Sequence, residues 1–107
     1  MPLEEFLQLS GFEEIDGFDK GKVKESSLRF LGRYEKELRN IEFLKIHLKE
    51  CCKQGSRTKY FIHSMLAFSG TQIVSKADEW NISKAVDESL NRMEREIEKW
   101  MKRNEIK

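Results

Sequence analysis

The sequence predicts a single α+β domain with the element order β-α-β-β-β-α. Apolar residues recur every three or four positions over residues 21–41 and 81–103, which is the period of an amphipathic helix. Residues 43–50 instead alternate apolar and polar side chains, which is the period of a strand with one solvated face. Several strands with only two helices favour a four-stranded mixed sheet that carries both helices on one face.

The first strand is expected over residues 4–10 and the first helix over residues 21–41. Asp19 is a candidate N-cap of this helix, because its carboxylate can accept a hydrogen bond from an unpaired backbone N–H. Gly32 lies in the helix interior, where glycine destabilises the helix by about 1 kcal/mol relative to alanine. A right-handed crossover through this helix would make the first two strands parallel.

The second strand is expected over residues 43–50, with Lys45, His47 and Lys49 on its polar side. Cys51 to Thr58 is polar and predicts a turn. Tyr60 to Phe68 predicts the next strand, but both of its faces are apolar enough to leave the core face undecided. Ser69-Gly70 predicts a hairpin turn into a last strand over Thr71 to Ala77. The helix over residues 81–103 would be capped by Asn81 or Asp78.

Length and composition restrict the class of protein. The chain has 107 residues, which fits one domain spanning residues 1–107, with an acidic segment at residues 1–19 that includes the first strand. No apolar run approaches the roughly 20 residues of a membrane span, and the acidic N-terminus is unlike a secretory or transit peptide. Cys51 and Cys52 are the only cysteines, so no disulfide framework or zinc motif is expected. These features indicate a reduced, cytoplasmic protein without a membrane partner.

The charge is distributed unevenly along the chain. Residues 1–19 hold six acidic residues and no basic one, whereas residues 20–60 hold twelve basic and five acidic residues. A field of one sign favours a polyanionic partner. The alternative is a solvated surface whose charge is balanced by the acidic N-terminal segment.

A resemblance to a known family becomes visible in the C-terminal third. The run Ala77-Asp78-Glu79-Trp80-Asn81-Ile82, followed by Ala85-Val86-Asp87 and by Leu90, Met93, Arg95, Ile97 and Lys99, resembles the ribosome hibernation-promoting factors. That family includes the ribosome-associated translation inhibitor and the sigma-54 modulation proteins. Ser10-Gly11 and the strand from Leu44 to Lys49 fit as well, so that the resemblance covers about residues 6 to 103. It implies a β-α-β-β-β-α domain similar to double-stranded RNA-binding domains.

The resemblance also implies a function. Family members lie in the small-subunit channel that messenger RNA and transfer RNA would occupy, where they block translation in idle cells and protect stored ribosomes. We therefore expect a non-enzymatic, cytoplasmic stress-response protein whose partner is the small ribosomal subunit and its rRNA, with no cofactor, metal or small-molecule substrate. No second domain follows residue 107, so the expectation is a short-type factor without the dimerising extension.

Five basic residues match positions at which the family tends to have a base: Arg92, Arg95 and Lys99 on the last helix, Arg33 on the first helix and Lys49 on the second strand. The three on the last helix step by three and four, so they share one helix face. Arginine can grip a phosphate with two parallel N–H bonds, whereas lysine acts as a point charge. The alternative is a solvated face, because Glu94, Glu96 and Glu98 interleave the same helix and can pair with these bases.

Two further hypotheses concern the sheet. Lys45, His47 and Lys49, together with Phe61 or His63, could form an aromatic and basic platform for RNA, which adds Lys45 to the candidate RNA-binding residues. The same face could instead be solvated or pair with another protein or a second copy through Tyr60 to Phe68, as in a weak homodimer. A small enzyme using His47, His63 or Cys51 is a third hypothesis, which no spaced motif supports.

Overall fold

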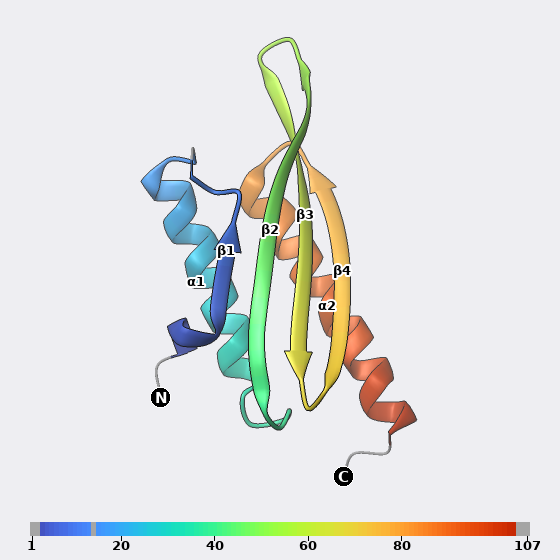
Figure 1. The fold of residues 1–107 in the computed structure, drawn as a ribbon. Helices are drawn as coiled ribbons and strands as arrows, with labels where there is room; N and C mark the ends of the chain where they lie inside the picture. Colours follow the sequence, from blue (N-terminus) through green and yellow to red (C-terminus); the bar gives the residue numbers. More distant parts are fainter. Residues whose placement is uncertain (1–2, 14, 105–107) are drawn as a thin grey trace.

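The computed structural model describes residues 3–13 and 15–104, and for residues 50–54 it describes the backbone alone. It confirms the predicted order of elements (Figure 1). These are a short 3-10 helix η1 (Leu3–Phe6), β1 (Leu7–Ser10), α1 (Gly17–Tyr34), β2 (Ile41–Gln54), β3 (Arg57–Phe68), β4 (Thr71–Glu79) and α2 (Ile82–Arg103).

The four strands form one mixed sheet in the order β1-β2-β3-β4. β1 pairs in parallel with β2, as the crossover through α1 predicts, and the other two pairings are antiparallel. Both helices lie behind the sheet in the view of Figure 1, so that one face is covered and the other is open. The β2–β3 hairpin extends beyond the remaining strands.

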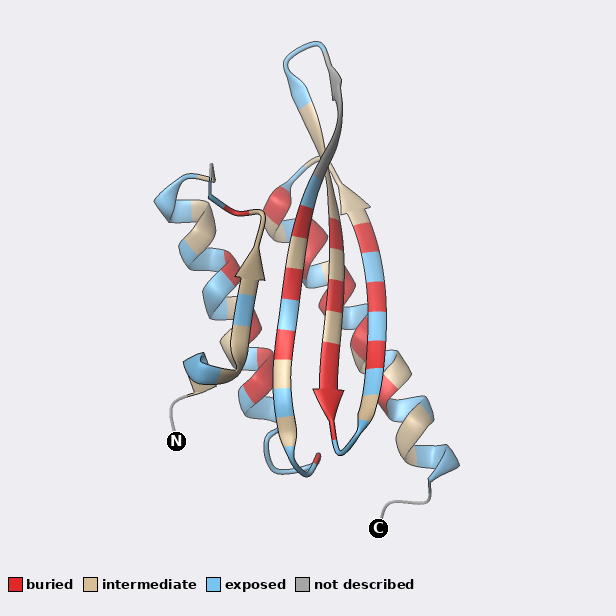
Figure 2. Cartoon of the chain, viewed as in Figure 1, coloured by how far each residue is buried: buried red, intermediate tan, exposed pale blue. Residues whose placement is uncertain are grey.

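The core lies between the helices and the covered face of the sheet (Figure 2). On β3 the buried side chains are Ile62, Ser64, Leu66 and Phe68, which settles the orientation that the sequence left open. Ala67 is also buried although its position belongs to the opposite face. Ser64 is tolerated in the core because its hydroxyl lies 2.7 Å from the hydroxyl of Ser89 on α2.

The first helix differs from its predicted bounds at both ends. It begins at Gly17 and its N-cap is Asp16, whose carboxylate accepts a 2.8 Å hydrogen bond from the backbone N–H of Asp19. The prediction of Asp19 as the cap was therefore wrong. The helix ends at Tyr34, although buried Leu38 continues its apolar pattern. The apolar pattern continues past the end of the helix because the connecting segment also contributes a side chain to the core.

The strands also differ in length from the prediction. β1 is shorter, because residues 3–6 form the 3-10 helix η1. The predicted polar turn from Cys51 to Thr58 is wrong: β2 and β3 stay paired up to Gln54 and Arg57, and the turn is Gly55-Ser56. Pairing there rests on backbone hydrogen bonds, which polar residues form as well as apolar ones.

Two other local predictions are confirmed. Ser69 and Gly70 both have positive φ and form the tight turn between β3 and β4. Asn81 caps α2, and its side-chain oxygen accepts a 3.0 Å hydrogen bond from the N–H of Lys84. The two turns and this cap fix where each strand ends, and thereby which side chains share the open face.

Gly11 permits the close approach of β1 to β2. Its φ of +85° lies in the left-handed region, and a Cβ at this position would collide with the main-chain oxygen of Leu48. Only glycine meets both requirements, which explains why Gly11 directly follows the first strand.

Candidate nucleic-acid interface

The open face of the sheet carries rows of side chains that run across the strands, and three neighbouring rows contain charged residues. The strand pairing places Ser10, His47, His63 and Lys76 side by side, one residue from each strand. The row on one side of it consists of Gln8, Lys45, Met65 and Val74. The row on the other side consists of Lys49, Phe61 and Asp78. Alternation along each strand directs these residues away from the helices.

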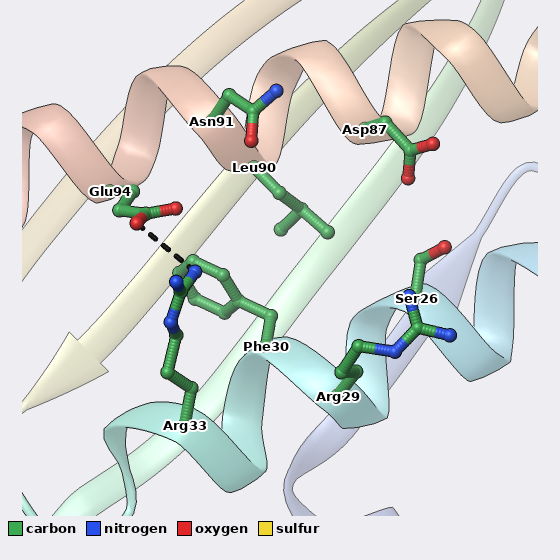
Figure 3. Close-up of a pocket in the computed structure, with 8 residues that line it drawn as sticks. All are labelled: Ser26, Arg29, Phe30, Arg33, Asp87, Leu90, Asn91 and Glu94. Atoms are coloured by element: carbon green, nitrogen blue, oxygen red, sulfur yellow. Dashed lines mark ion pairs between the residues drawn. The ribbon is translucent and has the colours of Figure 1, made fainter.

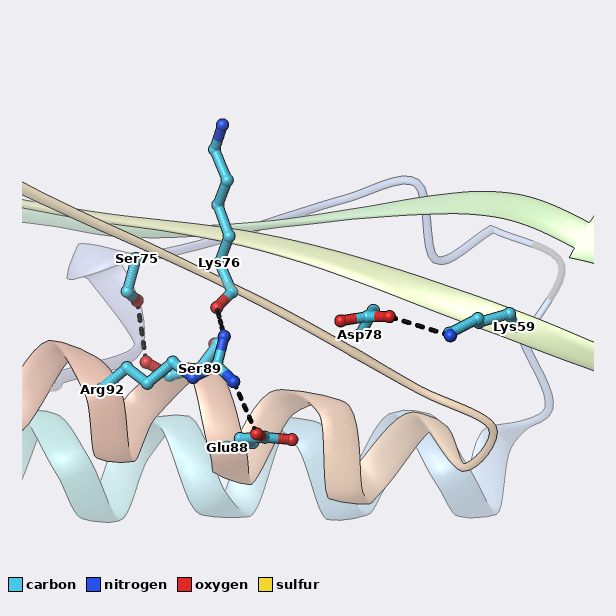
Figure 4. A network of polar contacts seen from close by, with 7 residues as sticks. All are labelled: Lys59, Ser75, Lys76, Asp78, Glu88, Ser89 and Arg92. Atoms are coloured by element: carbon cyan, nitrogen blue, oxygen red, sulfur yellow. Dashed lines mark hydrogen bonds and ion pairs between the residues drawn. The ribbon is translucent and has the colours of Figure 1, made fainter.

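The charges in these rows are predominantly positive. Lys45 and Lys49 come from β2 and Lys76 from β4, and the structure shows no ion pair for any of them among the side chains that it describes. Asp78 is the one carboxylate in the three rows, and it lies 3.0 Å from the ammonium group of Lys59 (Figure 4). Cations without a nearby carboxylate create an electrostatic field that attracts anions.

One depression lies on this face, and a second lies between the sheet edge and α2. A hollow of about 310 Å³ is lined by Lys45, His47, His63, Met65 and Val74, together with Ser10 and Ser64. A groove of about 340 Å³ lies between β4 and α2, and its lining residues are Val74, Ser75, Lys76, Arg92, Arg95, Glu96 and Lys99. Val74, which is 48% exposed, lines both. We call the basic residues along this path the cationic band: Lys45, His47, Lys49, His63, Lys76, Arg92, Arg95 and Lys99.

The three predicted bases on α2 have different surroundings. Arg92 donates to the main-chain oxygen of Lys76 at 2.7 Å and lies 2.8 Å from a carboxylate oxygen of Glu88 (Figure 4). Lys99 pairs more loosely with Glu96 at 3.5 Å. Arg95 is exposed and has no ion pair among the described side chains. Of these three residues, Arg95 is therefore the one whose charged group no described carboxylate pairs with, so it is available to an incoming phosphate.

Arg33 lies apart from the cationic band. It comes from α1 and pairs with Glu94 of α2 at 3.0 Å, across a groove of about 560 Å³ between the helices (Figure 3). Asp87 also lines this groove, and Arg29 there pairs with Glu25. The pairing reduces the positive charge that this groove presents to an anion.

The pKa of Tyr34 reflects the burial and the charges beside that groove. Burial, reinforced by the nearby carboxylate of Glu94, raises the pKa of Tyr34 to about 12. Glu94 also lines the groove, and its carboxylate opposes the approach of a phosphate there. The groove between the helices is thus a less favourable RNA site than the cationic band.

Sequence reasoning missed Lys76. Gln72, Val74 and Lys76 alternate with buried Ile73 and Ser75, so a period-two pattern in the last strand could have identified this lysine as facing outward. His63 was named only as a neighbour, because both faces of its strand were apolar. Burial, followed by the charges of Lys76, His47 and Lys49, lowers the pKa of His63 below its usual 6.5.

The surroundings of the histidines bear on the enzyme hypothesis. His47 Nδ1 lies 3.1 Å from the hydroxyl of Ser10, but the residues that flank His47 along its own strand on this face are Lys45 and Lys49. In the part of the chain that the structure describes, no three His, Cys, Asp or Glu side chains gather as metal ligands would. The side chains of Cys51 and Cys52 lie outside the described residues. Neither described helix is long and apolar enough to cross a membrane.

Two solved structures share this fold. A ribosomal subunit interface protein from Coxiella burnetii has a TM-score of 0.61 and 15% sequence identity, over 88% of this chain and 94% of that chain. The N-terminal domain of Protein Y from Thermus thermophilus has a TM-score of 0.59 and 14% identity, over 89% of this chain and 96% of that chain. No protein-family model and no curated protein sequence matches the chain. The predicted resemblance to hibernation-promoting factors is therefore confirmed at the level of the fold.

Proposed function

We propose that this chain is a non-catalytic ribosome-binding protein that contacts ribosomal RNA through the cationic band. The observation that carries the proposal is the continuity of the band, which runs from Lys45 on the open face of the sheet, across the exposed edge of β4, to Lys99 on α2. The similar fold of a ribosomal subunit interface protein supports the same partner.

Recognition would act mainly on the RNA backbone. Lys45 and Lys49 are four residues apart on one strand, which separates their Cα atoms by about 13 Å and lets them reach different phosphates. Arg95 can offer two parallel N–H bonds to one phosphate. The band offers a row of charges rather than a pocket that reads bases, and RNA helices are recognised in this way by shape and phosphate position.

We further propose that the bound protein occupies the channel for messenger RNA and transfer RNA in the small subunit, and thereby inhibits translation. This role would place the protein in the cytoplasm. The support is the resemblance in residues 77–99 together with the fold that the chain shares with Protein Y. In a reconstituted system, the protein should compete with messenger RNA and initiator transfer RNA for isolated small subunits. Binding without such competition would contradict the channel model while leaving RNA contact intact.

The decisive experiment is co-sedimentation with purified small ribosomal subunits. The variant that combines Lys45→Gln and Arg95→Gln should sediment with the subunits much less than the wild type. Arg33→Gln is the matched control for the single variant Arg95→Gln, since it removes one cation from the surface outside the band. If Arg33→Gln weakens binding as much as Arg95→Gln does, the groove between the helices is the interface instead.

Pairing of two copies through the open face remains the alternative function. Phe61 and Met65 are half-buried there and Val74 is exposed, which gives this face some apolar area. Bringing two such faces together would, however, also bring Lys45, Lys76 and their counterparts close to one another, and like charges in contact are unfavourable. A dimer that persists at micromolar concentration and fails to bind subunits would favour the alternative.

A further inference from the structure

We infer that the hollow between His47 and His63 is a binding site for one phosphate group, in which both imidazoles serve as hydrogen-bond donors. The inference rests on the proposed function for the source of that phosphate, the backbone of RNA. It adds two residues and a protonation step that the resemblance does not supply, because the basic positions it implies contain no histidine.

The geometry places the two rings together at the centre of the sheet. His47 and His63 are direct partners on neighbouring antiparallel strands, so their Cβ atoms lie about 5 Å apart. The hydroxyl of Ser10 lies 3.1 Å from Nδ1 of His47, which holds that ring by one nitrogen. Its Nε2 is the nitrogen that remains for a ligand. The hollow of about 310 Å³ beside the rings has room for a phosphate group with some of its water.

The charges around the pair select an anion rather than a metal cation. β1 contributes the uncharged residues Gln8 and Ser10 to this face. β2 contributes Lys45 and Lys49, and β4 contributes Lys76 directly beside His63. Asp78, the one carboxylate in the three rows, is already paired with Lys59. The helices pack on the opposite face, so their carboxylates do not line the hollow.

Binding at this site should take up a proton. Partial burial of His63, followed by the charges of Lys76, His47 and Lys49, lowers its pKa below the ordinary value, which favours the uncharged ring in the free protein at neutral pH. A phosphate in the hollow would offset those cations and favour the imidazolium. By linkage, affinity must then rise as the pH falls through the titration range of His63, and become constant once the ring is charged in the free protein.

Sulfate is a suitable probe because its charge is constant over the pH range used. NMR spectra of the two imidazole rings would be followed during sulfate titrations at about pH 5.5 and about pH 7.5. Sulfate should shift both rings and bind roughly tenfold more tightly at the lower pH. Equal affinity at both pH values, or shifts confined to other residues, would overturn the inference.

A second measurement uses a short oligouridine RNA, whose charge is also constant in this range. Acidification should strengthen binding to the wild type, and the slope of log K against log salt should steepen by about 0.7 per added cation. The variant that combines His47→Gln and His63→Gln should bind equally at both pH values, because it lacks both imidazole rings. Lys49→Gln, the matched control, should lower affinity at both pH values and keep the pH dependence.

The two measurements separate this inference from the proposed function. RNA binding that is tight but independent of pH would contradict the histidine site and leave the proposed function standing. Sulfate binding that strengthens on acidification, without RNA or subunit binding at either pH, would support the site and contradict the function. Circular dichroism would establish that the double glutamine variant is folded.

Discussion

The guanidinium group of Arg92 donates a 2.7 Å hydrogen bond to the main-chain oxygen of Lys76, which ties α2 to the exposed edge of β4 (Figure 4). An edge strand presents unpaired backbone groups that can pair with another chain. By occupying one of them, Arg92 covers part of this edge and holds Lys76 in the middle of the cationic band. Arg92 thus has a structural role that its neighbour Arg95 does not share.

Replacing Arg92 with methionine should therefore reduce stability. The change removes the hydrogen bond to Lys76 and the ion pair with Glu88, and a loss of about 1 kcal/mol in the free energy of unfolding is expected because both contacts are partly exposed to solvent. Arg95→Met, which breaks no ion pair with a described side chain, should change stability by less than about 0.5 kcal/mol. Urea unfolding of the two variants checks this. Equal losses would show that Arg92 is no more important to the fold than Arg95.

Binding to RNA should depend steeply on salt. Each phosphate contact releases a counterion, so the slope of log K against log salt should be about −0.7 to −0.9 per contact. Arg95→Gln should make the slope shallower by about one such contact. Arg33→Gln should leave it unchanged, because that guanidinium faces Glu94 outside the band. Fluorescence anisotropy at several salt concentrations measures the slopes. A flat response for the wild type would contradict phosphate-driven binding.

Two glycines should respond to alanine in opposite ways. Gly11→Ala introduces a Cβ that collides with the main-chain oxygen of Leu48 at a positive φ, and a loss of at least about 2 kcal/mol in unfolding free energy is expected. Gly32→Ala places its Cβ 3.6 Å from Leu3, an ordinary contact, within α1. The better helix propensity of alanine should then stabilise the protein by about 0.5–1 kcal/mol. Thermal and urea unfolding would show both effects. A tolerated Gly11→Ala would mean that β1 can move away from β2.

Stability should fall in alkaline solution because of Tyr34. Its pKa is raised to about 12 in the folded protein, from 10.0 as the ordinary value. The unfolded chain therefore loses this proton first, so the stabilising contribution is complete below pH 10 and is lost as the pH rises towards 12. The loss should reach about 2 kcal/mol. Tyr34→Phe lacks the ionisable group, so the stability difference between variant and wild type should shift by that amount between about pH 9 and pH 12. A constant difference would contradict the raised pKa.

Local sequence patterns were enough to predict the order of elements and the outward position of Lys45, His47 and Lys49. Both follow from periodicities that a local stretch of chain expresses on its own, namely 3.6 residues for a helix and two for a strand. The same reasoning placed Arg92, Arg95 and Lys99 on one helix face. It failed at Leu38, where the apolar pattern continues beyond the end of the helix, and between Cys51 and Thr58, where backbone pairing continues without an apolar pattern.

Which basic residues are available to a ligand depends on contacts that form only in the folded chain. Nothing in the sequence distinguishes Arg33 and Arg92 from Arg95. In the folded chain, Arg33 pairs with Glu94 on the other helix, and Arg92 pairs with Glu88 one turn away on its own helix. The row from Ser10 to Lys76 likewise depends on strand register, and Ser10 and His47 are 37 residues apart in the chain. Register arises when distant strands share one core, and a shift of one residue would turn every side chain to the other face. For this reason, the direct pairing of His47 with His63 across neighbouring strands could be established only in the folded chain.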